Sequence, residues 1–524
     1  MSSPLGLLHR CGGARPRLGP LRNLLGPRAA RTPARRGATL ARKGVAVAQE
    51  APPEARLALI DWTAPFAQPA AAVVAAAAYA GVLAPDATPW LRALLCAAGP
   101  LALHVLGPAL DLALGEKPPP ALPPGARPPP ADDLGSRLLP ALGVAAHLGA
   151  ALCCLVAVAA APLQPVPLAL LTYSLATSAA PTLAAAHELI HSRHPLHLAA
   201  ARLHLTLHWW YPYYRAHHQH HLHACTPLDY ASAPRGMDIY TYMAGYLGGS
   251  YTEAWQLACE ECRRAGHPVV SIHNGALMSF IAQPLLTAAI GLAFGPLAAA
   301  VHLAASVIML SYMSALDYAL HYGLSRPPLP PPSPTSNAAT TASTSATPSS
   351  TPISESASAS PSATSRVDSA AGASSSTAAA PPGPHAPPPP QRYSPLTPLN
   401  SWTSLYPWEN GVLYRVLIHA DHHRVAFKSY AWLRPGPGAP LFPGPINLLA
   451  LATFVPPLWM ALMDERADQV NARNRQLLAS GPGSAEGAGA WARGAEAEAA
   501  GPVAATREPG EAAWSEAMRG GGAT

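Results

Sequence analysis

The chain has 524 residues, of which 49% are hydrophobic and only 12% charged, against about 25% charged residues in soluble domains. Its net charge of +6 at pH 7 comes from the first 50 residues, which hold ten Arg or Lys and one acid, Glu50. The remaining residues include 24 basic and 27 acidic side chains, so no basic surface for nucleic acid is expected. The composition excludes a soluble protein of this size and predicts an integral membrane protein.

Residues 1–49 are rich in Arg and Leu and contain no acid. This composition is typical of an organelle transit peptide. The stretch 45–48, Val-Ala-Val-Ala, precedes an acidic region and favours a chloroplast cleavage site over a mitochondrial one. The alternative is a disordered basic tail.

Residues 59–326 are predicted to form the first part of a transmembrane domain, because long uncharged runs follow one another there. The runs are Trp62–Ala84, Ala93–Leu110, Leu138–Ala161, Pro162–Ala186 and Val269–Leu316. A bilayer core of about 30 Å takes about 20 helical residues, so the last run, broken at Gly295-Pro296, fits two spans. We therefore expect an all-α membrane protein with about six transmembrane helices, because no run alternates as a barrel strand does.

The polar stretches divide the rest of the chain. Residues 192–268 are rich in His and aromatic side chains and are expected outside the bilayer. Residues 327–392 are nearly all Ser, Thr, Ala and Pro, which predicts a disordered insertion. Residues 393–464 are expected to complete the domain, and residues 465–524 to form a low-complexity tail.

Twenty-two His residues are unusually many, and nine of them fall into groups with helical spacing. The nine are His187, His191, His217, His220, His221, His321, His419, His422 and His423. Spacings of three and four place side chains on one helix face. Two groups follow the fourth expected span and two follow the sixth, so all four reach the same side of the membrane. We interpret the nine as metal ligands, and His104, His147 and His302, inside apolar runs, as core residues.

The segment from His187 to His191 reads His-Glu-Leu-Ile-His and also matches the HExxH motif of zinc proteases. One catalytic zinc needs only three protein ligands, whereas about nine imidazoles converge here. The surplus indicates two metal ions, and imidazole with open positions suits iron and oxygen chemistry. A His-rich di-iron centre at one membrane face is the interpretation that we prefer.

The ordered motifs resemble those of the integral-membrane alkane monooxygenases, within the membrane fatty acid desaturase/hydroxylase superfamily. The resemblance rests on the HELIH segment, HHLHACTPLDYASA at 220–233, DYALHYGL at 317–324, and Ser401-Trp402 followed by HADHH at 419–423. PPLW at 456–459 and Met463-Asp464 resemble the closing segment of that family.

The resemblance implies an O₂-dependent di-iron monooxygenase that hydroxylates an alkyl chain, an alkane or a fatty acyl group, at its terminus. It implies two non-haem iron ions held by the nine His, entry of the substrate from membrane lipid, and electrons from a rubredoxin- or ferredoxin-like carrier. Glu188, Asp229 and Asp421 are candidates for orienting the ligands; the alternative is that they cap helices or face solvent. A fatty acid desaturase with the same irons, an intramembrane zinc protease and a non-catalytic metal carrier remain alternative functions.

The spacing in the second His group leaves one ambiguity. Ala216 stands where the family has a ligand, so the partner of His220 and His221 must come from the preceding turn. His217 lies three residues before His220 and four before His221, which places all three on one face. We therefore expect His217 to bind iron, and His218 and His223 not to.

Overall fold

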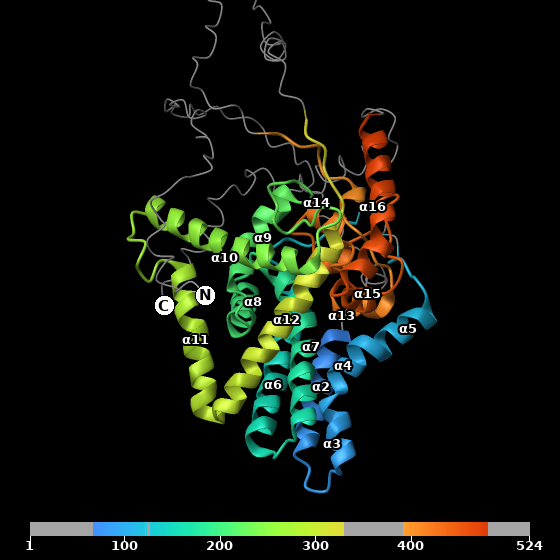
Figure 1. The fold of residues 1–524 in the computed structure, drawn as a ribbon. Helices are drawn as coiled ribbons and strands as arrows, with labels where there is room; N and C mark the ends of the chain where they lie inside the picture. The colour runs from blue at the N-terminus through green and yellow to red at the C-terminus, as the bar shows by residue number, and fades with distance from the viewer. Residues whose placement is uncertain (1–66, 121, 123–125, 330–390, 480–524) are drawn as a thin grey trace, which may run out of the picture. The chain divides into compact units, whose positions relative to one another are not determined.

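The computed structural model describes residues 67–120, 122, 126–329 and 391–479, and these residues contain helices and two isolated β-bridges. The expected transit peptide at 1–49 lies outside the described residues, as do nearly all of the insertion at 327–392 and the tail beyond residue 479. The all-α fold class is confirmed (Figure 1). The α-helices are α2 (Ala67–Val82), α3 (Pro89–Cys96), α4 (Ala98–Leu101), α5 (Gly107–Leu114), α6 (Leu138–Ala160), α7 (Pro165–Ile190), α8 (Pro195–Leu207), α9 (Tyr211–His223), α10 (Ile239–Arg264), α11 (Gly275–Phe294), α12 (Pro296–His321), α13 (Pro407–Val412), α14 (His419–Arg424), α15 (Ile446–Thr453) and α16 (Pro456–Ala479).

The described residues fall into two units, and the helices all belong to one of them. The other unit comprises 1–45 and 328–393, and its described residues are 328–329 and 391–393. Within it Pro328 pairs with Tyr393 in an antiparallel bridge, and the Leu329 amide donates to the Arg392 carbonyl at 2.8 Å.

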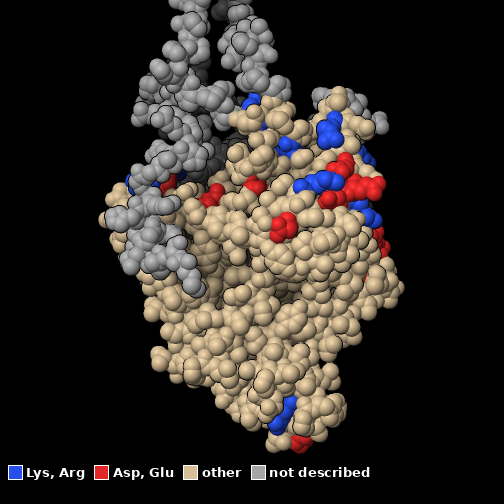
Figure 2. Space-filling model, viewed as in Figure 1, with Lys and Arg blue, Asp and Glu red and all other residues tan. Residues whose placement is uncertain are grey.

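Four helices of the described chain are long and apolar enough to cross a membrane, and up to six spans result if two bent helix pairs each count as one. The four are Gly135–Ala160, which includes a 3₁₀ turn before α6, and α7, α11 and α12. The bent pairs are Pro89–Cys96 with Ala98–Leu114, at 57°, and Ile446–Thr453 with Pro456–Ala479, at 119°. On the face shown in Figure 2, charged side chains gather at the end that carries α16 and near α3, and the surface between is uncharged.

Proline and glycine explain where these helices bend and end. Proline lacks the N–H that continues a helix, and Pro100 and Pro108 flank a π-helical stretch at Ala102–Leu106 in the first bent pair. Between α11 and α12, Gly295 adopts φ +91°, a conformation that favours glycine, and Pro296 begins the next helix. The break predicted at Gly295-Pro296 is thus where the two spans separate.

Small residues let the central helices approach closely. Gly143, Ala150 and Ala157 recur every seven residues on the buried face of α6, and a Cβ on Gly143 would overlap the Gln68 amide of α2. Gln68 in turn donates to Thr182 of α7 at 2.7 Å. The buried end of α7, from Leu171 to Ile190, therefore sits at the centre of the bundle.

Two buried carboxylates attach the C-terminal segment to the bundle. Asp111 of α5 accepts the backbone N–H groups of Trp408, at 2.6 Å, and of Glu409, at 3.2 Å, at the start of α13. Glu409 accepts the Ile446 N–H at the start of α15, at 2.6 Å. Since free N–H groups at a helix start attract carboxylates, these contacts fix both short helices around the segment that carries α14.

α16 continues to Ala479, so residues 465–479, placed in the tail from sequence, are helical. Ala467 and Asn474 of this part are buried. The Asn474 amide donates to the Ser325 carbonyl, and its side-chain oxygen lies 3.0 Å from the Thr397 hydroxyl. These contacts explain why the helix extends past the last apolar residues.

Candidate metal centre

Four helices bring the nine predicted His ligands together. His187 lies in the last turn of α7 and His191 is its C-terminal cap, while His321 ends α12. The short helices α9 and α14 supply three each: His217, His220 and His221, and His419, His422 and His423. All are buried except His221, which is partly exposed.

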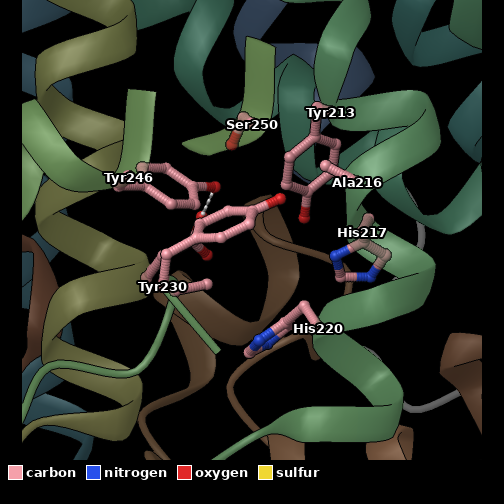
Figure 3. Close-up of a pocket in the computed structure, with 9 residues that line it drawn as sticks. Tyr213, Ala216, His217, His220, Tyr230, Tyr246 and Ser250 are labelled. Atoms are coloured by element: carbon pink, nitrogen blue, oxygen red, sulfur yellow. Dashed lines mark hydrogen bonds between the residues drawn. The ribbon is translucent and has the colours of Figure 1, made fainter. Parts of the chain in front are cut away.

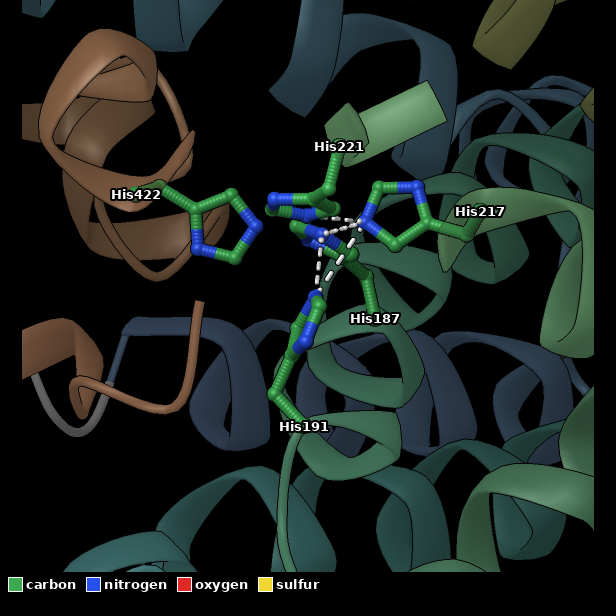
Figure 4. Close-up of side chains that lie close together, drawn as sticks. All are labelled: His187, His191, His217, His221 and His422. Atoms are coloured by element: carbon green, nitrogen blue, oxygen red, sulfur yellow. Dashed lines mark hydrogen bonds between the residues drawn. The ribbon is translucent and has the colours of Figure 1, made fainter. Parts of the chain in front are cut away.

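The nine divide into two groups. In the five-His group, His187, His191, His217, His221 and His422 each offer a ring nitrogen, and these nitrogens lie within 4.8 Å of one another. Figure 4 shows the five rings pointing at a common centre. The Nε2 atoms of His187, His191 and His217 form a triangle with sides of 2.8, 3.2 and 3.3 Å.

The four-His group comprises His220, His321, His419 and His423, whose ring nitrogens also lie within 4.8 Å of one another. The Nε2 atoms of His419 and His423 are 3.0 Å apart. The two groups are neighbours, because the ring centres of His221 and His423 are 4.3 Å apart. Both α9 and α14 therefore contribute to both groups.

The chemistry of this donor set fits two metal ions. Nitrogens bound about 2.0–2.1 Å from one ion lie roughly 2.9–3.4 Å apart in octahedral or tetrahedral geometry, close to the Nε2 separations of 2.8–3.3 Å seen here. The Nε2 atoms of His321 and His422 are buried without a hydrogen-bond partner among the described residues. A bound cation would satisfy these converging lone pairs.

The electrostatics favour neutral, ligand-ready imidazoles on α9 and α14, with His220 as the exception. Burial, with the neighbouring His side chains, lowers the pKa of His217, His221 and His422 well below the ordinary value. Burial alone would also lower the pKa of His220, but the adjacent Asp229 carboxylate raises it above the ordinary value.

Polar partners fix three of the four rings of the four-His group from outside, those of His220, His321 and His419. The Nδ1 of His220 lies 2.8 Å from Asp229 Oδ2, and Asp229 also accepts the Ser232 hydroxyl. The Nδ1 atoms of His321 and His419 lie 3.1 Å from the carbonyls of Asn400 and Val416. Each contact orients a ring so that Nε2 points inward, as outer partners of metal-binding His do.

Glu188 and Asp421 support the centre through neighbouring segments. The Glu188 carboxylate forms a buried ion pair with Arg137 at 2.9 Å and accepts the Tyr430 N–H at 3.1 Å. Asp421 binds Lys428 at 2.9 Å and also pairs with Arg424. Both carboxylates thus hold the chain that follows α14. Because the Glu188 carboxylate is bound in an ion pair with Arg137, it is not placed to accept a proton as the base of a zinc protease does.

The two His residues expected not to bind, His218 and His223, lie outside both groups, and His223 is partly exposed. Sequence reasoning missed Arg137, which stands 50 residues before the HELIH segment, and Lys428, which follows the HADHH segment by five residues. It also missed the contacts of the Asn400 and Val416 carbonyls with His321 and His419, because every residue has a backbone carbonyl and the residue type does not show which one is used. An acid just after a predicted span, as Glu188 is after the run that ends at Ala186, is the signal that could have pointed to a buried cation.

His321, Tyr322 and Gly323, within the DYALHYGL motif, are held in place by packing against α16 and Trp402. The Trp402 indole donates to the Tyr322 carbonyl at 3.0 Å, and the Tyr322 hydroxyl donates to Asp464 at 2.6 Å. Gly323 has φ +72°, and a Cβ there would lie 2.7 Å from the Cβ of Ala467. The segment therefore joins the end of α12, and His321 with it, to α16.

A small cavity touches one ligand of each group. His217 and His220 form one side of it, and Tyr213, Tyr230 and Tyr246 line the rest with Ala216, Ala231, Ser250 and Asp317 (Figure 3). The Tyr246 hydroxyl donates to Asp317 at 2.6 Å, so its polar group is satisfied and its ring faces the cavity. The lining is mostly aromatic and apolar carbon.

Comparison with known proteins gives consistent matches. The fatty acid desaturase family matches residues 163–354. The chain is 27% identical over 283 residues to alkane 1-monooxygenase 2 of Pseudomonas aeruginosa (53% of this chain, 59% of that protein), and 24% identical over 283 residues to alkane 1-monooxygenase 1 of the same species (54% and 58%). It is 32% identical over 169 residues to the xylene/toluene monooxygenase hydroxylase component XylM of Pseudomonas putida (31% and 45%). The chain thus spans under two thirds of the length of these relatives.

Proposed function

Because the chain belongs to the alkane hydroxylase family, within the fatty acid desaturase superfamily, we propose that it is a membrane-bound, non-haem di-iron monooxygenase. Its substrate would be an alkyl chain, an alkane or a fatty acyl group, hydroxylated at its terminus. The observation that carries the proposal is the pair of adjacent His groups, five and four rings, gathered from α7, α9, α12 and α14.

The five-His and four-His groups would each hold one iron ion through neutral imidazoles. The irons would supply O₂ activation: one oxygen atom enters a C–H bond, and the other leaves as water with two electrons and two protons. The protein orients the rings through Asp229 and the carbonyls of Asn400 and Val416, and burial keeps bulk water from the rings. The electrons would come from a rubredoxin- or ferredoxin-like carrier.

The aromatic cavity beside His217 and His220 supports a hydrocarbon substrate. Its lining is mostly apolar, which suits the end of an alkyl chain better than a charged head group. The cavity has room for about one water molecule, so a chain end would enter it only with movement of the lining tyrosines. A chain end there would lie beside ligands of both groups, which favours reaction at the terminal carbon.

Product analysis tests this function. Membranes that contain the protein are supplied with a reduced carrier, O₂ and mid-length alkanes or fatty acids, and the products are identified by mass spectrometry. We expect alcohols. Alkenes alone would identify a desaturase, and one zinc per chain with no iron would restore the protease alternative.

We also propose that residues 1–49, outside the described part of the chain, direct import into an organelle, with the chloroplast favoured by the Val-Ala-Val-Ala stretch at 45–48 that precedes an acidic region. The relatives named above are bacterial, so this concerns only the present chain. A fusion of 1–49 to a fluorescent protein should enter chloroplasts, and a uniform cytosolic signal would contradict the proposal.

A further inference from the structure

A third group of His side chains lies apart from the nine. His147 of α6 and His204 and His208, at the end of α8, offer ring nitrogens within 4.8 Å of one another. All three side chains are fully buried. His147 lies about 14 Å along α6 from its first residue, at 1.5 Å per residue, so this three-His group is well inside the helical bundle.

As in the five-His group, the Nε2 atoms of two imidazoles in this group lie within about 3 Å of each other. The Nε2 atoms of His147 and His208 face each other at 2.9 Å. Their Nδ1 atoms lie 3.0 Å from the Ser178 hydroxyl of α7 and 3.2 Å from the Ser306 hydroxyl of α12. If both Nδ1–H groups donate to these hydroxyls, two Nε2 lone pairs point at each other, an arrangement that a shared cation stabilises.

The surroundings of His204 distinguish a metal site from a simple hydrogen bond between His147 and His208. Its ring centre is 5.3 Å from that of His147 and 4.9 Å from that of His208. Neither of its ring nitrogens has a hydrogen-bond partner among the described residues, although the side chain is fully buried. A His147–His208 hydrogen bond would leave this imidazole unsatisfied, whereas a metal ion would engage it.

His104 is a partly buried His whose two ring nitrogens both have hydrogen-bond partners. It also lies in an apolar run, but its Nε2 is 2.7 Å from the Tyr173 hydroxyl and its Nδ1 is 3.2 Å from the Asn447 carbonyl. Both nitrogens of His104 therefore have partners. The buried His302 also lacks hydrogen-bond partners for both ring nitrogens among the described residues, but its nitrogens belong to none of the converging groups there. What indicates a ligand at His204 is therefore its missing partners together with its convergence on His147 and His208.

We propose that His147, His204 and His208 form a third metal site, separate from the nine-His centre, for a first-row transition-metal ion. The group contains three imidazoles and, within the described residues, no carboxylate or thiolate. Imidazole suits zinc, copper, iron and nickel, and three protein ligands leave one position open. The ion cross-links α6 to α8, and Ser178 and Ser306 tie the two outer rings to α7 and α12.

The test is metal content of the full-length protein in lipid nanodiscs, by mass spectrometry, for the wild type, His204→Gln and His104→Gln. We expect His204→Gln to hold one metal equivalent fewer than the wild type, and His104→Gln to match the wild type. Equal contents in the wild type and His204→Gln would overturn the proposal.

A second measurement avoids any effect of substitution on folding. Iron-loaded wild-type protein is titrated with Co²⁺ after brief chelation of weakly bound metal. Uptake of one equivalent, with visible absorption of a nitrogen-bound Co²⁺, is expected, and no uptake would contradict the site. The two readouts do not involve hydroxylation, so failure of the proposed enzyme activity leaves them interpretable.

Discussion

The nine-His centre and the three-His group use the same side chain in two different settings. The nine lie at helix ends and on the short helices α9 and α14, and polar groups from loops orient several of them. The three lie inside the bundle and are oriented by serines of the neighbouring helices. The first set therefore depends on how the segment after residue 394 folds, whereas the second depends on helix packing alone.

The largest effect is expected from removing a ligand of the nine-His centre. His217→Ala should lose the iron of the five-His group. Turnover should fall further than it does when a group that only orients a ligand is removed, a loss of about 10–100-fold. His218→Ala, its neighbour on α9, is the matched control and should keep both irons. Iron per chain and alcohol formation are measured; if His218→Ala loses iron and His217→Ala does not, the ligand assignment on α9 is wrong.

Breaking the buried ion pair beneath the centre should mainly lower stability. Glu188→Gln leaves Arg137 charged and uncompensated, which costs about 3–5 kcal/mol for a buried pair. Thermal unfolding in detergent should show a clear drop in the midpoint temperature, although the Gln amide oxygen can still accept the Tyr430 N–H. The control is Glu260→Gln, which removes exposed pairs with Arg263 and Arg264 and should change little. Equal stability of both variants would show that the pair does not support the fold.

A smaller effect is expected where the outer partner of one ring is changed. Asp229→Asn keeps the shape of the side chain but removes the charge beside His220, so metal affinity or turnover should fall about 10–100-fold. Asp238→Asn is the control, because Asp238 caps α10 on the surface. Unchanged iron affinity and turnover in Asp229→Asn would refute the orienting role.

The smallest effect is expected from shortening the Ser-, Thr-, Ala- and Pro-rich insertion. The N–H of Leu329 donates to the carbonyl of Arg392 at 2.8 Å, so the two ends of 330–390 are close enough for a short linker. Loop closure costs depend only on the logarithm of length. Replacing 330–390 with a Gly/Ser linker should leave iron content and turnover unchanged, and loss of iron from a protein that still folds would assign these residues a structural role.

Four of the six predicted spans, which correspond to α6, α7, α11 and α12, and the convergence of the nine His could be predicted because both leave local patterns. The run Trp62–Ala84 instead contains α2, whose 16 described residues are too short for a span. Uncharged runs mark the spans, and His spacings of three and four mark helix faces, as with His419, His422 and His423. Proline and glycine also predict where helices end, as at Gly295-Pro296. The short helices α13 and α15 were not predicted, because carboxylates distant in sequence, Asp111 and Glu409, stabilise their first turns.

The three-His group left no such pattern. His147 stands alone in an apolar run and was interpreted as a core residue, and its partners are 57 and 61 residues away. His204 and His208 lie in residues 192–268, and α8 packs against α6 and α7, which brings His204 to His147. Only tertiary packing shows this contact, and the same holds for Arg137 and Glu188.

Isotope labelling tests the central claim most directly. The protein is given ¹⁸O₂, a reduced carrier and an alkane in unlabelled water, and the product is analysed by mass spectrometry. A monooxygenase places one ¹⁸O atom in the terminal alcohol, and His217→Ala should abolish that product. Alcohol without label, or alkene as the only product, would contradict the account.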